Sequence, residues 1–161
     1  MLIPAILFYD VVLFVHVLAV VLAFGVVFTY PMLDAYIRRA NPGDLVVLHR
    51  FQVFLTRRVV TPSMVVVLAA GLYLALDRWS LGDPWISATF TILIVIFGLV
   101  GAVLTPTERR LAELAEADRR SGAGKPSEAY EAQARKYATF GGLATLLIVV
   151  AIFLMTVKPG A

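Results

Sequence analysis

The stretch VVLFVHVLAVVLAFGVVFTYPML, residues 11–33, contains no charged side chain and decides the fold of this 161-residue chain. A helix needs about 20 consecutive apolar residues to cross the roughly 30 Å hydrocarbon core of a bilayer. Three further charge-free stretches of similar length follow it, namely Val59–Leu76, Pro84–Thr107 and Tyr137–Val157. The sequence therefore predicts four membrane-spanning helices.

The composition supports a membrane location for the whole chain. Hydrophobic residues make up 60% of it and charged residues only 16%, so one soluble core cannot cover the apolar side chains. No alternating barrel pattern occurs, so helices are the expected spanning elements. We predict one all-α domain over residues 1–161, an integral membrane four-helix bundle. Its spans are expected at about 9–33, 59–77, 84–105 and 137–157, with cytoplasmic loops 34–58 and 106–136.

Most basic residues lie in those two loops, which the positive-inside rule assigns to the cytoplasm. They are Arg38, Arg39, Arg50, Arg57, Arg58, Arg109, Arg110, Arg119, Arg120, Lys125, Arg135 and Lys136. Both termini are then expected outside, in the cytoplasmic (inner) membrane of a bacterium, with the first span retained rather than cleaved. The basic balance follows from this topology and does not indicate nucleic-acid binding. The chain has no cysteine, which excludes disulfides, thiolate catalysis and cysteine-held clusters or haem.

The cytoplasmic loops carry helix signals of their own. NPGD, residues 41–44, fits a helix start with an asparagine cap and a proline in the first turn. Thr105 and Glu108 fit a capping box, and Gly122 fits a helix end. Amphipathic helical segments are therefore expected at the membrane surface: the first begins at NPGD and runs into the second span, and the last begins near Pro126 and continues into the fourth span. Its charged residues are expected to form a solvated face: Glu128, Glu131, Arg135 and Lys136.

His16 is the one histidine inside a predicted span. With a rise of about 1.5 Å per residue, it lies about 21 Å above Tyr30, which marks the cytoplasmic end of the first span. The same count brings a set of small and polar residues from the other spans to this level: Gly71, Leu72, Tyr73, Thr89, Thr91 and Ala151. Gly71, Tyr73, Thr89 and Thr91 are therefore candidate neighbours of the imidazole.

Three roles for His16 follow from the cost of a polar group in hydrocarbon. It can form an interhelical hydrogen bond with Thr89, Thr91 or Tyr73, worth on the order of 1 kcal/mol. It can ligate haem iron, with Gly71 leaving room for a flat macrocycle. It can also belong to a proton or ion relay, although such pathways normally contain several ionisable groups.

His49 is predicted to be an interfacial residue, because it precedes the second span by about three turns and neighbours Arg50. A joint metal site with His16 is implausible, since helical rise places the two residues on opposite sides of the membrane. The sequence also has no nucleotide-binding glycine pattern, nucleophile elbow or pair of buried carboxylates. His16 is therefore the main candidate for chemistry.

Three segments resemble the HemJ-type membrane proteins. The first, HVLAVVLAFGVVFTYPML, begins at His16 and has an alanine and a proline at the family's distances from the histidine. The second, TPSMVVVLAAG over residues 61–71, is similar to the family's TPAM segment and its following glycine, and the basic pair Arg57 and Arg58 precedes it. The closing VKPG, which contains Lys158, is similar to the lysine-proline ending of these proteins.

The resemblance implies a four-helix membrane fold that binds haem b. HemJ proteins use this fold to oxidise protoporphyrinogen, and CopD-like copper-resistance proteins share it more loosely. His16 matches the family's proposed haem ligand. Arg57 and Arg58 are candidates for pairing with haem propionates or acidic lipid head groups, although basic residues at this boundary more often anchor the topology. HemJ proteins carry a lysine a few residues after a tryptophan in the third helix, where this chain has Thr89. We therefore expect a protein closer to the uncharacterised relatives, with little or no protoporphyrinogen oxidase activity.

The leading hypothesis is thus a haem b protein with a redox role, in contact with the lipid bilayer and a membrane redox partner. Its candidate cofactor-binding residues are His16, Gly71, Tyr73, Thr89, Thr91, Arg57 and Arg58. Met64 is not expected to be a second ligand, because it lies about 12 Å below His16 by helical rise. The alternative is a non-enzymatic structural or transport protein in which His16 only holds helices together.

Overall fold

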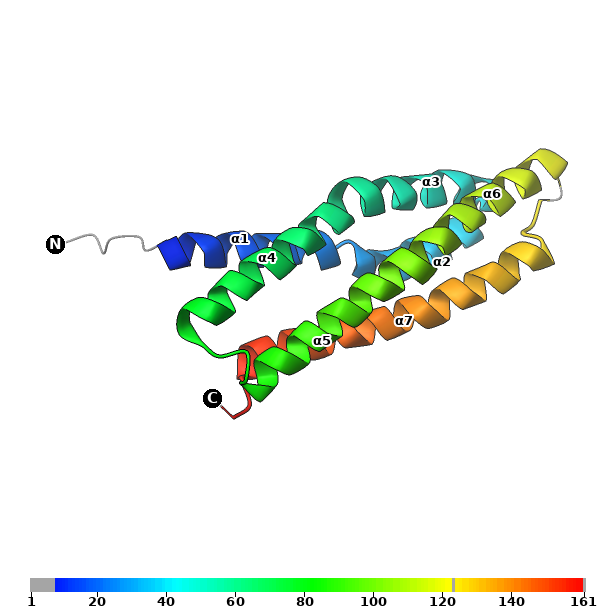
Figure 1. Cartoon of the computed structure of the whole chain (residues 1–161). Coiled ribbons are helices and arrows are strands. Elements are labelled where there is room, and N and C mark those ends of the chain that lie inside the picture. The colour runs from blue at the N-terminus through cyan, green and yellow to red at the C-terminus, as the bar shows by residue number, and fades with distance from the viewer. Residues whose placement is uncertain (1–7, 123, 161) are drawn as a thin grey trace.

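The computed structural model describes residues 8–122 and 124–160, which form helices joined by short turns (Figure 1). The α-helices are α1 (Phe8–Phe24), α2 (Tyr30–Ala40), α3 (Leu45–Leu55), α4 (Thr61–Arg78), α5 (Pro84–Leu99), α6 (Thr105–Ser121) and α7 (Glu128–Val157). Short segments of tighter or wider helix connect several of them: η1 (Val27–Thr29), η2 (Pro42–Asp44), η3 (Thr56–Val60) and η4 (Val100–Leu104).

These elements combine into four long helices, Phe8–Ala40, Pro42–Arg78, Pro84–Ser121 and Glu128–Val157, each long and apolar enough to cross a membrane. The predicted all-α class is therefore confirmed. The helices contain 33, 37, 38 and 30 residues, which corresponds to about 45–57 Å each. Much of the sequence between the apolar spans therefore continues the long helices, as expected for the segments that begin at NPGD and near Pro126. The segment that begins at Thr105 also continues a long helix and is not a separate one.

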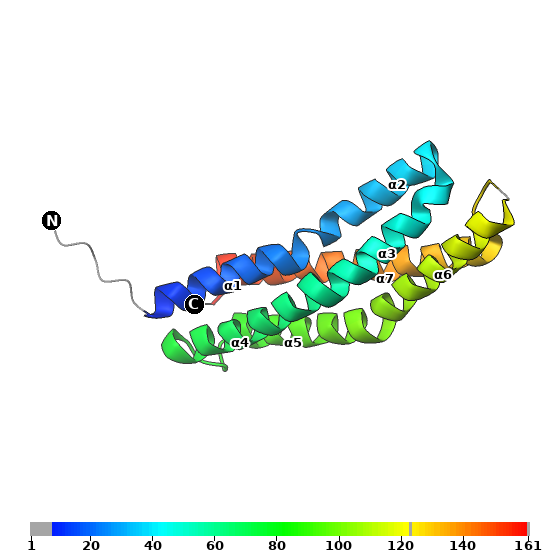
Figure 2. The same cartoon turned by 90° about the horizontal axis from the view of Figure 1, so that it is seen from above.

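Three of the four long helices change geometry near the middle, each beside a proline. A 3₁₀ turn, η1, precedes Pro31, and π-helical turns η3 and η4 precede Pro62 and Pro106. Proline lacks the amide N–H that would bond the preceding turn, so helices bend at such positions. Figure 2 shows the bends between α1 and α2 and between α5 and α6, whereas α7 continues past them without interruption.

The helix-end signals in the sequence have mixed outcomes. The Asn41 side chain accepts a hydrogen bond from the backbone N–H of Gly43 at 3.2 Å, and Gly122 ends α6 with φ +68°, as predicted. The capping box at Thr105 and Glu108 is wrong. The chain is already helical at this point, because η4 runs directly into α6, and no side chain caps that junction.

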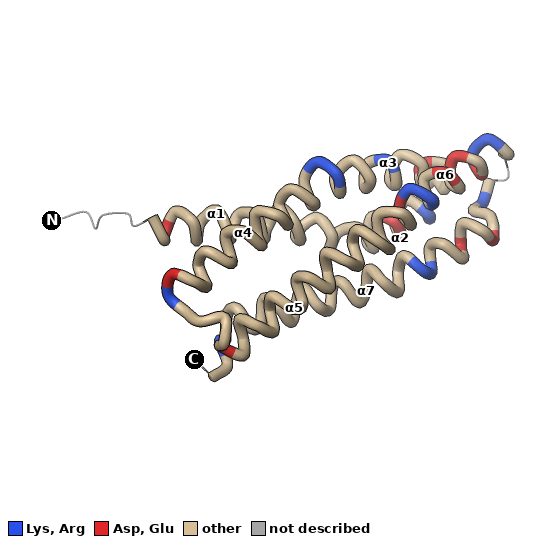
Figure 3. The backbone as a smooth tube through the Cα atoms, in the orientation of Figure 1, with Lys and Arg blue, Asp and Glu red and all other residues tan. Residues whose placement is uncertain are grey.

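The bends divide the bundle into two halves with different helix pairs. In the half that we call the terminal half, α1 packs mainly on α4 and α5 on the second part of α7. In the other, which we call the charged half, α3 packs on α6, α6 on the first part of α7 and α2 on α3. Figure 3 shows that most Lys, Arg, Asp and Glu residues lie in the charged half. Each half has its own apolar core.

The outer surface of the terminal half is apolar. Phe14, Val21, Ile94 and Phe153 all have more than half of their surface exposed. A soluble protein would rarely leave so large an apolar surface in water, whereas lipid chains cover it without cost. The terminal half is therefore the part of the molecule suited to the hydrocarbon core.

Candidate functional site

A cavity of about 430 Å³ lies between α1, α4, α5 and α7 in the terminal half. Its lining is largely apolar, and His16 contributes an imidazole to it. Sites for small organic ligands typically occupy about 300–1,000 Å³ and combine apolar walls with a few polar groups. The cavity has the size and lining of such a site.

The imidazole of His16 packs tightly against Gly71 of α4. A Cβ atom at position 71 would lie 3.1 Å from Cε1 and 3.5 Å from Nδ1 of His16, so the ring would have to move by a few tenths of an ångström to accommodate a side chain there. Nδ1 is buried and makes no hydrogen bond of regular geometry within the described residues, and the ring lies close to the backbone of Val67. The imidazole is therefore packed on α4 at the wall of the cavity.

The depth count from the sequence places four residues at the cavity. His16, Gly71, Thr89 and Ala151, each from a different helix, all line it. Thr89 is buried, and its hydroxyl donates a hydrogen bond to the backbone carbonyl of Trp85 at 2.7 Å.

Tyr73 and Thr91 lie at the expected level but do not line the cavity. The ring of Tyr73 packs edge-on against Phe8, with 5.4 Å between the centroids, and its hydroxyl lies near Asp77. Thr91 is exposed and donates to the carbonyl of Ser87 at 2.9 Å. Within residues 8–122 and 124–160, neither of these residues nor Thr89 forms a hydrogen bond with His16.

The cavity opens sideways between α1 and α7. Residues that line it from α4 and α5, such as Val67 and Leu93, are buried, whereas Leu13 and Val17 of α1 and Ile152 of α7 are exposed. Consistently, α1 packs on α4 and α7 on α5, while α1 and α7 make no comparable contact. The opening faces the apolar surface that lipid would cover.

Two cations lie at the end of the cavity where α7 ends. The ammonium of Lys158 lines it and lies 4.6 Å from the ring centroid of Trp79 and 5.7 Å from that of Trp85. Arg78 lies over the ring of Tyr9 at 3.8 Å, and Tyr9 also lines the cavity. These contacts combine apolar stacking with positive charge at this end of the cavity.

The predicted basic pair is elsewhere. Arg57 and Arg58 are exposed in η3, and about 20 Å of helix separates Arg58 from Gly71. Met64 is buried in the apolar core outside the cavity lining, in agreement with its exclusion as a ligand, whereas Met155 lines the cavity. The structure therefore separates Arg57 and Arg58 from the His16 site.

A second polar site, which the sequence did not reveal, surrounds Glu108. One carboxylate oxygen, Oε1, accepts hydrogen bonds from the hydroxyls of Tyr137 at 2.9 Å and Thr56 at 3.3 Å. Burial raises the pKa of the Glu108 carboxyl, and these two hydrogen bonds oppose the shift. The acidic residue that fitted a helix cap is instead a buried group where three long helices meet.

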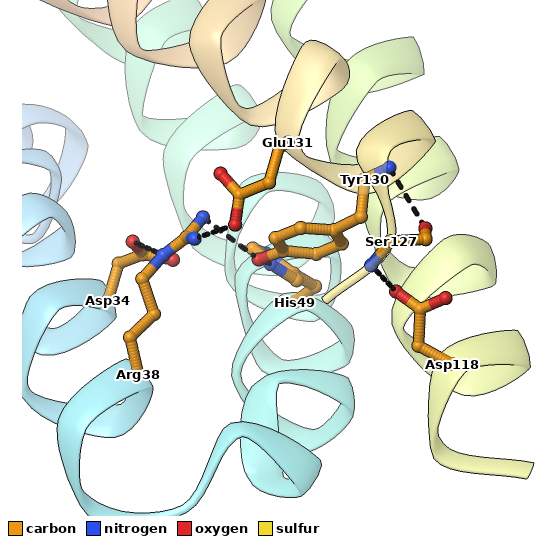
Figure 4. Close-up of polar contacts among 7 residues, drawn as sticks. All are labelled: Asp34, Arg38, His49, Asp118, Ser127, Tyr130 and Glu131. Carbon is orange, nitrogen blue, oxygen red and sulfur yellow. Dashed lines mark hydrogen bonds and ion pairs between the residues drawn. The ribbon is translucent and has the colours of Figure 1, made fainter. Parts of the chain in front are cut away.

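A third cluster holds the charged half together around His49 (Figure 4). His49 is buried rather than interfacial, with Nδ1 2.7 Å from Oε1 of Gln52 and Nε2 2.7 Å from the Tyr130 hydroxyl. Because the amide oxygen only accepts, Nδ1–H of His49 donates to it, and Nε2 of the neutral ring accepts from Tyr130. Burial lowers the pKa of His49, which favours this neutral form.

Arg38 extends this cluster across three helices. Its guanidinium forms 2.6 Å ion pairs with Asp34 and Glu131 and a 3.5 Å hydrogen bond to the hydroxyl of Tyr130. The Glu131 side chain remains 39% exposed, so this residue of the predicted solvated face also links two helices through an ion pair. Ser127, the N-cap of α7, accepts from the backbone N–H of Tyr130 and holds it in place at the start of the helix.

Among the described residues, no group of three or more His, Asp or Glu side chains is arranged to hold a metal ion. The fold and the cavity instead define a class, a multi-pass integral membrane protein whose four long helices enclose an apolar, side-opening cavity with one imidazole.

The chain belongs to the DUF2269 family, described as predicted integral membrane proteins, whose family model matches residues 10–159. Comparison with the curated proteins gives no match, and comparison with the solved structures gives none either.

Proposed function

We propose that this membrane protein binds haem b in the cavity of the terminal half, with His16 as an axial ligand, and that the protein has a redox role. The observation that supports the proposal is the imidazole of His16, which lines a 430 Å³ apolar cavity without a regular hydrogen bond at Nδ1 in the described part of the chain. The resemblance to HemJ-type proteins, centred on the same histidine, points to the same ligand.

The residues around the cavity fit a flat, amphipathic group. Ligating histidines usually direct their second nitrogen to a backbone carbonyl or carboxylate, and the ring of His16 lies close to the backbone of Val67, which would provide such a neighbour. Apolar walls would contact the macrocycle, and the ammonium of Lys158 would pair with a propionate, in place of Arg57 and Arg58. A bound haem supplies one-electron redox chemistry, tuned by its axial ligand and by its burial.

The proposed redox role does not include protoporphyrinogen oxidation. Thr89 occupies the position of the HemJ lysine, and its hydroxyl is bonded to the backbone of its own helix. We propose instead electron exchange with a membrane redox partner. We also propose that the charged half lies in the cytoplasm of a bacterium, because it carries most of the basic residues.

Optical spectroscopy tests the proposal directly. Protein expressed with adequate haem supply and purified in detergent is expected to show a Soret band that His16→Ala removes. Phe14→Ala is the matched control, because Phe14 lies on the same helix, is exposed and does not line the cavity. A stable, colourless preparation that takes up no added hemin would refute haem binding and favour the structural or transport alternative.

A further inference from the structure

Glu108 is buried where the third long helix passes from the terminal half into the charged half. Only 3% of its surface is exposed. Its Oε1 accepts from Tyr137 and Thr56, but its Oε2 is buried with no hydrogen-bond partner in the described ranges. Tyr30 is only 6% exposed, and its hydroxyl is also buried without a hydrogen-bond partner in the described ranges. A buried polar group without a hydrogen-bond partner destabilises a fold, so two of them together require an explanation.

Both unpaired groups belong to residues that line one small cavity of about 30 Å³. A water molecule needs roughly 10–15 Å³ of such volume and two to four polar partners. Glu108, Tyr30, Tyr137 and Thr56 provide the polar part of the lining, and the remaining lining residues are mostly apolar. The cavity therefore has the size and the partners for one or two ordered waters.

The groups that face Glu108 are neutral. Tyr30 comes from α2, Thr56 from η3 and Tyr137 from α7, and across the described residues no Lys or Arg forms an ion pair with the Glu108 carboxylate. Its sequence neighbour Arg109 is exposed. A buried carboxylate without a counter-charge favours its protonated form, and burial accordingly raises the pKa of Glu108.

We propose that Glu108 is a proton-binding site, in which the protonated carboxyl donates from Oε2 to a cavity water that Tyr30 also contacts. In this state Oε1 is the carbonyl oxygen, and it still accepts from Tyr137 and Thr56. Loading is a proton transfer in which a hydronium ion gives its proton to the carboxylate and becomes water. Unloading reverses the step. The site does not depend on a ligand in the larger cavity.

An apolar layer separates this site from the His16 cavity. Phe24, Ile96 and Ile148 are buried and lie between the two cavities, so that each of these residues lines both. Apolar constrictions of this kind exclude water. The proton therefore exchanges through the charged half and not through the His16 cavity.

Infrared difference spectroscopy of the full chain in detergent, titrated with pH in H₂O and D₂O, tests the proposal. We expect a carbonyl band of a protonated carboxyl at neutral pH, a shift of that band in D₂O, and its loss as the pH rises. Glu108→Gln is expected to abolish the band. The glutamine carbonyl can keep both hydrogen bonds, so circular dichroism should show an intact fold. Glu113→Gln, an exposed position on the same helix, is the matched control and should keep the band.

A second variant tests the water. Tyr30→Phe removes one of its partners, so it is expected to shift the carbonyl frequency while the band itself remains. Absence of a protonated carboxyl at neutral pH in the wild-type protein would overturn the proposal. A band that survives Glu108→Gln would also overturn it. So would loss of the band on adding sodium or potassium chloride at constant pH, because that result would identify a metal-cation site.

Discussion

Replacing Tyr130 by phenylalanine removes a single hydroxyl from the interior of the charged half. Tyr130 is fully buried, and its hydroxyl lies 2.7 Å from Nε2 of His49, which is itself only 2% exposed. The ring remains, so the loss comes mainly from the buried acceptor on His49 that is left without a donor. Such a loss costs about 1–3 kcal/mol. Arg38 keeps its 2.6 Å ion pairs with Asp34 and Glu131, so its weaker contact with the hydroxyl adds little.

The free energy of unfolding, measured by SDS titration in mixed micelles and followed by circular dichroism, is therefore expected to fall by about 1–3 kcal/mol. Tyr36→Phe is the control, because Tyr36 is exposed and should change stability by less than about 0.5 kcal/mol. The double variant His49→Leu/Tyr130→Phe should lose less than the sum of the two single variants, since neither leaves the other unpaired. Equal stability of Tyr130→Phe and Tyr36→Phe would refute the assignment of this hydrogen bond.

Three further outcomes follow from the described contacts. Burial lowers the pKa of His49, so below a pH of about 6.5 the unfolded chain binds a proton more readily than the folded chain does. The free energy of unfolding should therefore decrease as the pH is lowered through this range, and His49→Asn should make that decrease smaller. Gly71→Ala should destabilise the protein in SDS titrations, because crowding His16 costs about 1–3 kcal/mol against roughly 1 kcal/mol gained in helix propensity. Gly98→Ala, where nothing lies within 4 Å, should be neutral or stabilising, and an equal loss at both glycines would contradict the packing described. Lys158 ends α7 with φ +49°, a backbone conformation that glycine adopts more readily than alanine. Lys158→Gly should therefore be more stable than Lys158→Ala by about 1 kcal/mol and unfold at a higher SDS concentration. Identical midpoints would argue against this backbone conformation.

Helix number and helix level could be predicted from the sequence because both follow from length. The rise per residue placed His16, Gly71, Thr89 and Ala151 at one depth, and the structure brings all four to one cavity. Rise does not determine which way a side chain points, however. Two residues along a helix correspond to a rotation of about 200°, which is why Tyr73, two positions after Gly71, faces away from the cavity.

The polar clusters could not be predicted because they depend on contacts between distant segments. Glu108 fits a local capping pattern, and its burial requires η3 and α7 to pack against the start of α6. Likewise, Arg38 and Glu131 are 93 positions apart, so nothing nearby in the sequence indicates their ion pair. The sequence predicts a membrane-surface position for His49 because it lies outside the apolar spans. The residue is buried because the long helices extend beyond those spans and pack together as the charged half.

The sideways opening between α1 and α7 determines the phase from which a ligand arrives. A molecule that reaches the cavity through this opening is drawn from the lipid, where each additional methylene group favours it by about 0.8 kcal/mol, or about fourfold in concentration. Occupancy then follows the mole fraction of ligand in the bilayer or micelle rather than its aqueous concentration. Titrations at two detergent concentrations should therefore give different apparent affinities per litre of water and a single value per mole of detergent.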